Sequence, residues 1–287
     1  MRIDRANKRV YVRQSSLNDM VICPERSRLK DVLPSFITST DATTMGTAVH
    51  HGIEQILGGM DPSLAYGEAW EMFLHLFSKG FKETNLDPEK YQLHIESMMT
   101  AFIEGIMDEV EFGGEVEWKF TAPLGMKVDG YELFVEGTMD YIDPNGVIWD
   151  WKTSSRAYNG KDKQSTSIQA SVYALAAVEN GKSDFPVDFR YGVMVRQDKP
   201  KAQIVYLTRT KAHIDWIRST IEPVIRYALS VGYEHPWMRN DTSALCSDKW
   251  CSHWSVCKGA YLSPQDLAIP AVPVTISPVV DTQGVTE

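Results

Sequence analysis

The feature that most constrains the fold is a turn signal, Pro144-Asn145-Gly146, between two runs rich in β-branched and aromatic residues. Runs of this composition on either side of such a turn are typical of a β-hairpin. Similar runs lie before and after it, and the full set covers 116–124, 131–143, 147–153, 188–196 and 202–209. The sequence therefore predicts a central sheet over about 115–210.

Helices are predicted on both sides of this segment. Asp61-Pro62 and Asp87-Pro88 are typical helix starts, Pro24 interrupts the first helix, and glycines end others. The expected helices cover 14–30, 44–57, 61–77, 87–106, 169–180 and 210–230. The order of helices, three strands, a helix, two strands and a helix predicts one α/β domain with a helical part at about 44–110.

Composition excludes several classes of protein. The 287 residues are 43% hydrophobic and 23% charged, as in globular proteins, and they contain no apolar run long enough to cross a membrane. The N-terminus is positively charged but lacks a following apolar segment, so we expect a cytoplasmic protein without a secretory signal. The net charge of -9 does not indicate a nucleic-acid binder, so such a function would depend on local patches or a bound metal.

Charged residues interrupt the apolar strand that follows the turn. The two-residue period of a strand places Asp150 and Lys152 on one face, opposite Trp149 and Trp151. Asp140 lies on the paired strand. Two carboxylates brought together across a hairpin suit Mg²⁺ or Mn²⁺, and a nearby lysine would orient water or stabilise a phosphate. An internal Asp–Lys ion pair is the alternative that the residues leave open.

Two helices carry further candidates. His50 is a potential imidazole ligand one turn before Glu54, and Gly46 would allow close backbone approach near the start of their helix. Gln169 and Tyr173 lie one turn apart on the helix after the Asp-x-Lys strand. Alone, a histidine on an amphipathic helix is more often structural or exposed than a ligand, and the Gln169–Tyr173 pair by itself would indicate little.

Four short motifs follow one another along the chain: Gly46-x-x-x-His50, Gly137-x-x-Asp140, Asp150-x-Lys152 and Gln169-x-x-x-Tyr173. In this order and spacing they resemble the motifs of RecB-like nucleases in the PD-(D/E)XK superfamily. The opening Ser16-Leu17-x-x-x-x-x-Cys23-Pro24 and a C-terminal cysteine trio resemble the iron-sulfur subgroup, which includes AddB-type and CRISPR-associated single-strand exonucleases. The resemblance covers residues 15–260.

The resemblance implies an α/β fold with a restriction-endonuclease-like core, in which helices flank a mixed central sheet. It implies metal-assisted phosphodiester hydrolysis by a DNA exonuclease acting on single-stranded ends. The implied metal ligands are His50, Asp140, Asp150 and the Trp151 carbonyl, with Glu54 as a further candidate. Lys152 would assist the attacking water, and Gln169 and Tyr173 would position the lysine or the DNA backbone.

The cysteines form a separate pattern. Cys23 stands alone, whereas Cys246, Cys251 and Cys257 lie within twelve residues. A thiolate quartet suits Zn²⁺ or an iron-sulfur cluster and would clip the N- and C-terminal segments together. The resemblance favours a 4Fe-4S cluster, although four residues separate Cys246 from Cys251 where the family has two; Zn²⁺ and a substitute ligand, His253, remain alternatives. Loss of such a clip is expected to destabilise the fold.

DNA contact would need local basic groups in this acidic chain. We expect residues 1–14 to form a basic N-terminal arm, followed by a nuclease domain at 15–263 and a disordered tail at 264–287. Lys161 and Lys163, after the active strand, are further candidates for phosphate contact, and Tyr158 for stacking on a base.

Two function classes remain at this point. The favoured one is a metal-dependent exonuclease in recombination, repair or related DNA processing, working with a separate helicase or recombination protein because no ATPase motif is visible. The alternative is a non-catalytic DNA-binding or scaffold protein of nuclease fold within a recombination or CRISPR-type complex. The sequence does not give the oligomeric state.

Overall fold

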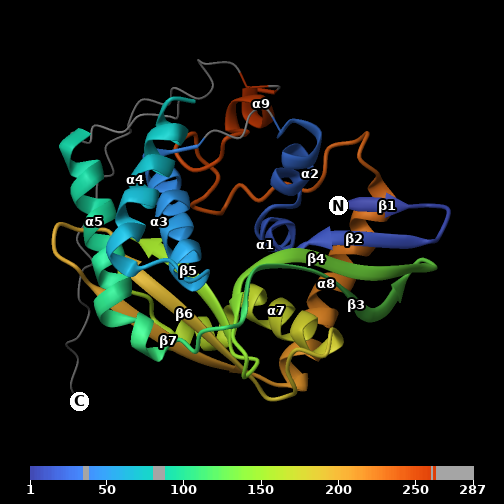
Figure 1. The fold of residues 1–287 in the computed structure, drawn as a ribbon. Helices are drawn as coiled ribbons and strands as arrows, with labels where there is room; N and C mark the ends of the chain where they lie inside the picture. Colours follow the sequence, from blue (N-terminus) through green and yellow to red (C-terminus); the bar gives the residue numbers. More distant parts are fainter. Residues whose placement is uncertain (35–38, 80–87, 260, 263–287) are drawn as a thin grey trace, which may run out of the picture.

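The structure is a computed structural model, and it describes residues 1–34, 39–79, 88–259 and 261–262 (Figure 1). Its centre is a sheet of mixed strand direction with helices on both faces. The described strands are β1 (Arg2–Asp4), β2 (Arg9–Arg13), β3 (Glu115–Val128), β4 (Tyr131–Ile142), β5 (Ile148–Ser154), β6 (Val187–Val195) and β7 (Ala202–Arg209). The predicted fold class, with a mixed sheet flanked by helices, is confirmed.

The sheet order is β1-β2-β4-β5-β6-β7, with β3 paired to β4 as well. The pairs β2–β4 and β5–β6 are parallel, and the other pairs are antiparallel. The predicted hairpin of β4 and β5 closes through its turn, where the Asp143 side chain accepts hydrogen bonds from the backbone N–H groups of Asn145 and Val147. This hairpin places β5 near the middle of the sheet.

The helices begin and end at the expected residue types. Thr40 caps α3 in a reciprocal capping box with Thr43, Asp61 caps α4 ahead of Pro62, and Ser167 caps α7. The helical elements are α1 (Gln14–Ile22), α2 (Pro24–Val32), α3 (Asp41–Leu57), α4 (Pro62–Phe77), α5 (Pro88–Gly105), the 3₁₀ turn η2 (Met107–Glu109), α6 (Gly160–Thr166), α7 (Ile168–Glu179), α8 (Lys211–Val231) and α9 (Trp254–Gly259).

Two apolar cores cover the two faces of the sheet. The α3–α5 layer packs against Trp149 and Trp151 of β5, with Phe102 of α5 edge-on to Trp151. On the other face, α1, α7 and α8 bury a second core with β2, β3 and β4. Figure 1 shows the α3–α5 layer on one side of the sheet and α7 and α8 on the other. The methionine-rich stripe of α5, including Met98 and Met99, is buried in the first core, as expected of core packing.

The N-terminal segment differs from the expected basic arm. Residues 2–4 and 9–13 form β1 and β2, and β2 runs parallel to β4 with Val10 and Val12 fully buried. The alternation of buried valines with exposed arginines explains the difference, because it is the two-residue period of a half-buried strand. The expected tail at 264–287 lies outside the described residues. Within the described part of the chain, the structure contains no helix of the length and apolarity that a membrane span requires.

Candidate functional site

The candidate site lies where β4 and β5 separate. Their paired residues end at Tyr141 opposite Trp149, so Asp140 and Asp150 stand just beyond the ladder. The Trp151 N–H donates to Asp140 Oδ2 at 2.7 Å. A carboxylate thus occupies the opening between two central strands, and the sheet brings the predicted acids together there.

Asp150 is almost completely buried, at 1% exposure. Its Oδ1 accepts a hydrogen bond from Gln169 Nε2 at 2.8 Å, and the Lys152 ammonium group forms an ion pair with its Oδ2. No hydrogen bond of good geometry to that Oδ2 is present among the described residues. The carboxylate therefore keeps a buried acceptor that points into the site without a full complement of donors.

Gln169 and Tyr173 of α7 support Asp150 from the opposite layer. Gln169 Nε2 also lies 3.3 Å from the Tyr173 hydroxyl, which in turn donates to the Thr138 carbonyl of β4 at 2.7 Å. This chain of contacts fixes the amide against the acid, and it joins α7 to both strands of the hairpin. The i, i+4 pair that the sequence singled out thus faces the predicted site.

Burial sets the charge states of the site. It raises the pKa of Asp140 and of Asp150 to about 6, because a carboxylate loses its hydration inside the protein. Burial would lower the pKa of Lys152, yet the attraction of Asp150 and Asp140 outweighs it and raises that pKa. In the absence of a metal, the charged Lys152 ammonium group therefore lies beside two carboxyl groups whose pKa values are raised.

His50 reaches this cluster from α3. Its Nδ1 lies 3.7 Å from Asp140 Oδ2, and the ring also hydrogen-bonds to the backbone of Trp151. Burial lowers the pKa of His50 to about 4, with Lys152 adding to the effect. The imidazole is consequently neutral at neutral pH, which is the form that binds metals. Gly46 allows α3 to come this close to β5, because a Cβ at this position would lie only 2.8 Å from Thr153 Oγ1.

Glu117 of β3 is a residue that the sequence reading missed. It faces Asp140 across the β3–β4 pair, between the registered pairs Val116–Tyr141 and Trp118–Met139, and it has φ +48°. Burial raises the pKa of Glu117 and of Glu54; the charge of Glu54 adds to the effect on Glu117, and the charge of Asp140 adds to the effect on Glu54. Glu54, one turn after His50, therefore lies beside the site as expected. Only the alternation Glu115-x-Glu117 within a strand could have indicated its partner.

Aromatic residues line the Lys152 side of the site. Lys152 Nζ lies 5.8 Å from the ring centroid of Tyr191, whose hydroxyl contacts Ser167 Oγ at 2.6 Å. Lys163 of α6 sits over the Tyr158 ring at 4.4 Å and near Tyr191 at 5.9 Å. Of the two predicted lysines, Lys163 thus packs beside the site. Lys161, in the first turn of α6, is exposed.

The residues present fit a hard divalent cation in donor chemistry. Two carboxylates and a neutral imidazole lie close to one another, and their oxygen and nitrogen donors suit such an ion. In residues 1–34, 39–79 and 88–259 no three His, Cys, Asp or Glu side chains are already arranged around one ion position. Lys152 instead balances the acids in this arrangement.

All four cysteines line one small cavity of about 30 Å³ between α2 and the C-terminal segment. Burial raises the pKa of the Cys246 and Cys257 thiols. Arg26, Arg239 and Lys258 line the same cavity and would balance bound thiolates. The predicted substitute ligand, His253, points elsewhere: it is buried, and its Nε2 lies 3.1 Å from the Leu33 carbonyl oxygen.

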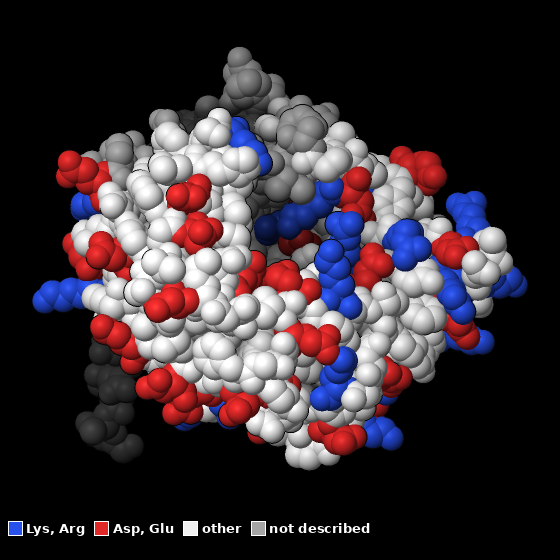
Figure 2. Space-filling view, in the orientation of Figure 1, with Lys and Arg blue, Asp and Glu red and all other residues white. Residues whose placement is uncertain are grey.

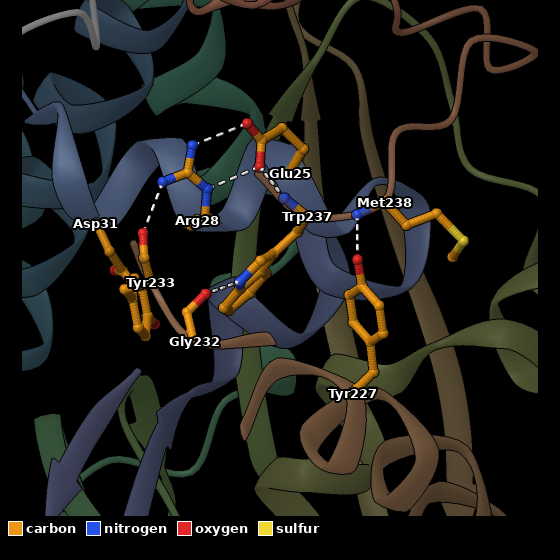
Figure 3. A network of polar contacts seen from close by, with 8 residues as sticks. All are labelled: Glu25, Arg28, Asp31, Tyr227, Gly232, Tyr233, Trp237 and Met238. Carbon is orange, nitrogen blue, oxygen red and sulfur yellow. Dashed lines mark hydrogen bonds and ion pairs between the residues drawn. The ribbon is translucent and has the colours of Figure 1, made fainter. Parts of the chain in front are cut away.

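Beside this cavity, a set of polar contacts joins α2 to residues 232–238, and we call it the terminal clasp (Figure 3). Glu25, 2% exposed, accepts two hydrogen bonds from Arg28, at 2.8 and 2.9 Å, and one from the Trp237 N–H at 2.7 Å. Arg28 also donates to the Tyr233 carbonyl, and Tyr233 donates its hydroxyl proton to Asp31. These contacts therefore join α2 to the segment 232–238.

Figure 2 shows a hollow between the α3–α5 side of the molecule and the side that carries α1, α2 and β4. Acidic side chains gather at its lower edge, and lysine and arginine side chains on the edge toward β2 and β4. Part of the N-terminal positive charge is paired with glutamates of β4: Arg2 with Glu136 at 3.2 Å and Arg9 with Glu132 at 3.9 Å.

Comparison with known proteins agrees with this geometry. A crystal structure of a candidate exonuclease from Eubacterium rectale aligns with a TM-score of 0.54 and 14% identity, covering 86% of this chain and 92% of that one, and it shares the fold. A crystal structure of SSO0001 aligns at a TM-score of 0.39 and 16% identity, covering 91% of this chain and 90% of that one. No curated protein matches. Residues 13–258 match the family model of the PD-(D/E)XK nuclease superfamily, and the chain belongs to that superfamily.

Proposed function

We propose that this protein is a metal-dependent DNA exonuclease that hydrolyses phosphodiester bonds at single-stranded ends. The observation that carries the proposal is the placement of two buried acids and Lys152 at the opening between β4 and β5. Members of the superfamily typically use Mg²⁺ or Mn²⁺. When bound, such a cation supplies Lewis-acid activation of water and neutralises charge that develops on the phosphate.

The side chains of the site divide the remaining work. Asp140, Asp150, His50 and the Trp151 carbonyl would hold the cation, and Glu54 is a further candidate. Lys152 stays protonated because of its raised pKa, so it would orient the attacking water and offset charge on a phosphate oxygen. Gln169 holds Asp150 Oδ1 in place, and Tyr173 holds Gln169. Asp150 thereby keeps one orientation while its other oxygen remains available.

Single-stranded DNA is the proposed substrate because lysine and tyrosine side chains lie together beside the two acids. Lys163 over Tyr158 forms a platform on which a base would stack next to Lys152. Lys161, exposed at the start of α6, would contact a phosphate. A separate helicase or recombination protein would supply the single strand.

We further propose that the cysteine cavity holds a 4Fe-4S cluster, with Zn²⁺ as the alternative. Cys23, Cys246, Cys251 and Cys257 meet there, beside three cationic side chains that suit an anionic thiolate–metal group. Anaerobic purification followed by iron, sulfide and zinc analysis distinguishes the two. Four irons with a broad visible absorption support the cluster, whereas one zinc without it identifies the alternative.

The decisive experiment follows end-labelled single- and double-stranded DNA with Mg²⁺, Mn²⁺ or EDTA. Asp150→Ala and Lys152→Ala are each expected to lower the cleavage rate at least about a thousandfold while the fold is kept. Asp188→Ala and Lys201→Ala, which change exposed residues of the same sheet region, are the matched controls and should cleave like the wild type.

The outcomes separate the two function classes. Metal-dependent release of labelled mononucleotides or short fragments from an end, lost in both site variants, supports an exonuclease. A folded protein that binds DNA but does not cleave it, whichever metal is added, would refute the enzyme and favour the scaffold alternative. Activity that is equal in wild type and Asp150→Ala would reveal a contaminating nuclease.

A further inference from the structure

A second groove opens on the β4 side of the molecule, with a volume of about 580 Å³. Its walls come from the start of α1, from β3 and β4, and from α7. Residues that line it include Arg13, Gln14, Ser15, Lys119, Gly137 and Tyr173. None of these except Tyr173 belongs to the proposed cation site, so the groove is a separate feature of the surface.

Gln14 is the unusual residue of this groove. Its exposed fraction is 6%, and its amide nitrogen Nε2 is buried without a hydrogen-bond acceptor in the described structure. A buried amide donor that lacks an acceptor is costly, and most such donors in proteins are paired. Gly137 makes room beside it, because a Cβ there would lie 3.6 Å from Gln14 Cβ and 2.8 Å from the Phe120 ring. Gln14 thus carries an unpaired donor in the wall of the groove.

The start of α1 adds donors of the same kind. The N-cap residue Arg13 makes no side-chain capping bond, and the first turn contains no acidic residue. The N–H groups and the dipole of a helix start favour an anion. The Arg13 side chain is 74% exposed and lies 4.0 Å from Glu136 Oε1, and Lys119 is exposed on the facing strand. Glu136 is the one acid that lines the groove, and the pairing with Arg2 and Arg13 balances it.

Tyr173 links this groove to the cation site. Its ring lines the groove, and its hydroxyl group contacts both the Thr138 carbonyl and the Gln169 amide that holds Asp150. A DNA strand whose scissile phosphate lies at Asp150 could therefore continue across Thr138 and Gly137 into the groove.

We propose that the groove at the start of α1 binds one backbone phosphate of the DNA strand, with the Gln14 amide, the first-turn N–H groups of α1 and the Arg13 and Lys119 side chains as its partners. This inference rests on the proposed action on DNA. Because all of these partners would bind the phosphate and none a base, the groove would position the strand without reading its sequence.

The test uses Ser15→Asp, which places a negative charge at the second residue of α1. An acid in a first turn favours the helix, so the variant should fold like the wild type. Ala212→Asp makes the same change at the exposed second residue of α8, outside the groove, and is the matched control. Binding of a labelled single strand is measured by fluorescence anisotropy in EDTA over a range of salt concentrations. A strand of about 20 nucleotides is long enough to cover a binding site of several nucleotides.

We expect Ser15→Asp to bind about tenfold more weakly, with a salt slope smaller by about 0.7 for one lost phosphate contact, and Ala212→Asp to bind as the wild type. Gln14→Leu, which removes the donor at similar size, should bind about fivefold more weakly. A neutral methylphosphonate is placed at each linkage in turn; at one of the positions where it weakens wild-type binding, it should leave the affinity of Ser15→Asp unchanged.

Unchanged affinity and slope in both Ser15→Asp and Gln14→Leu, with a wild type that binds and cleaves DNA, would overturn the groove and leave the proposed function standing. A wild type that neither binds nor cleaves single-stranded DNA would instead overturn the proposed function, and the groove with it.

Discussion

Asp150 and Glu25 are buried to the same degree but differ in the hydrogen bonds that their carboxylates accept. Glu25 receives three hydrogen bonds, from Arg28 and Trp237, and it holds the terminal clasp together. Asp150 has one hydrogen bond, from Gln169, and its other oxygen is held only by the ion pair with Lys152, while burial raises its pKa. A satisfied buried acid contributes to folding, whereas an incompletely satisfied one costs stability that only a ligand can recover. The comparison therefore separates a structural centre from a functional one.

Removing the clasp acid should have the largest effect on stability. Glu25→Ala leaves the Arg28 guanidinium and the Trp237 N–H without their buried partner, so unfolding free energy should fall by about 3–5 kcal/mol. Urea denaturation measures it. Glu222→Ala breaks an exposed Glu–Arg pair on α8 and should cost no more than about 0.5 kcal/mol. Equal losses in the two variants would contradict the structural role of the clasp.

Neutralising Asp140, an acid of the proposed cation site, should change stability in the opposite direction. The pKa of Asp140 is about 6 in the folded protein and 3.8 in the ordinary case, so the folded state binds protons more readily between these values. Stability is therefore lost as pH rises from about 4 to 6, by roughly 3 kcal/mol for this group. Asp140→Asn keeps an acceptor for the Trp151 N–H and removes the charge.

In EDTA, Asp140→Asn should match the wild type below pH 4 and exceed its stability by about 2–3 kcal/mol above pH 6, while cleavage is lost. Paired denaturation curves at pH 4 and pH 8 measure the difference. A variant less stable than the wild type at pH 8 would show that the charge of Asp140 stabilises the fold, and the contrast with Glu25 would fail.

Added Mn²⁺ should stabilise the protein through the proposed cation site alone. At a Mn²⁺ concentration about a hundred times its dissociation constant, the folded wild type should gain about 2.7 kcal/mol. Asp150→Asn should lose this gain, and Glu25→Ala should keep it because the clasp lies outside the proposed ligand set. Thermal shifts with and without Mn²⁺ provide the readout, and an equal gain in Asp150→Asn would place the bound metal elsewhere.

Tyr173→Phe should have the smallest effect. It removes the hydrogen bond to the Thr138 carbonyl and the contact with Gln169, so we expect a loss of about 1 kcal/mol in stability. If the hydroxyl only positions Gln169, cleavage should fall less than in Asp150→Ala and keep its metal dependence. A complete loss of cleavage would assign the phenol a direct role in the reaction.

Much of this organisation was predictable from local patterns. The two-residue period placed Asp150 and Lys152 opposite Trp149 and Trp151, and the structure buries both tryptophans in the α3–α5 core. Glu117 could not be found in this way, because its closeness to Asp140 depends on the register of β3 against β4 and on a left-handed backbone. Contacts between distant segments are set by packing of the whole chain, and no local pattern records them.

The terminal clasp shows the same limit. Glu25 and Trp237 are 212 residues apart, and neither lies in a motif that indicates the other. The N-terminal strands were missed for a related reason. Val10 and Val12 alternate as in a strand, but their partner, β4, begins more than a hundred residues later. The positive charge of the segment masked that alternation and favoured an arm.

The clasp also determines when the domain can be completed during synthesis. The partner of Glu25 emerges from the ribosome more than two hundred residues after Glu25 itself, which at 5–20 residues per second is a delay of roughly 10–40 s. During that interval α2 cannot pack against the C-terminal segment, and Glu25, which is buried in the folded protein, is exposed to water. Nascent chains truncated before Trp237 should consequently be cleaved by proteases at α2, and chains extended past Met238 should be protected there.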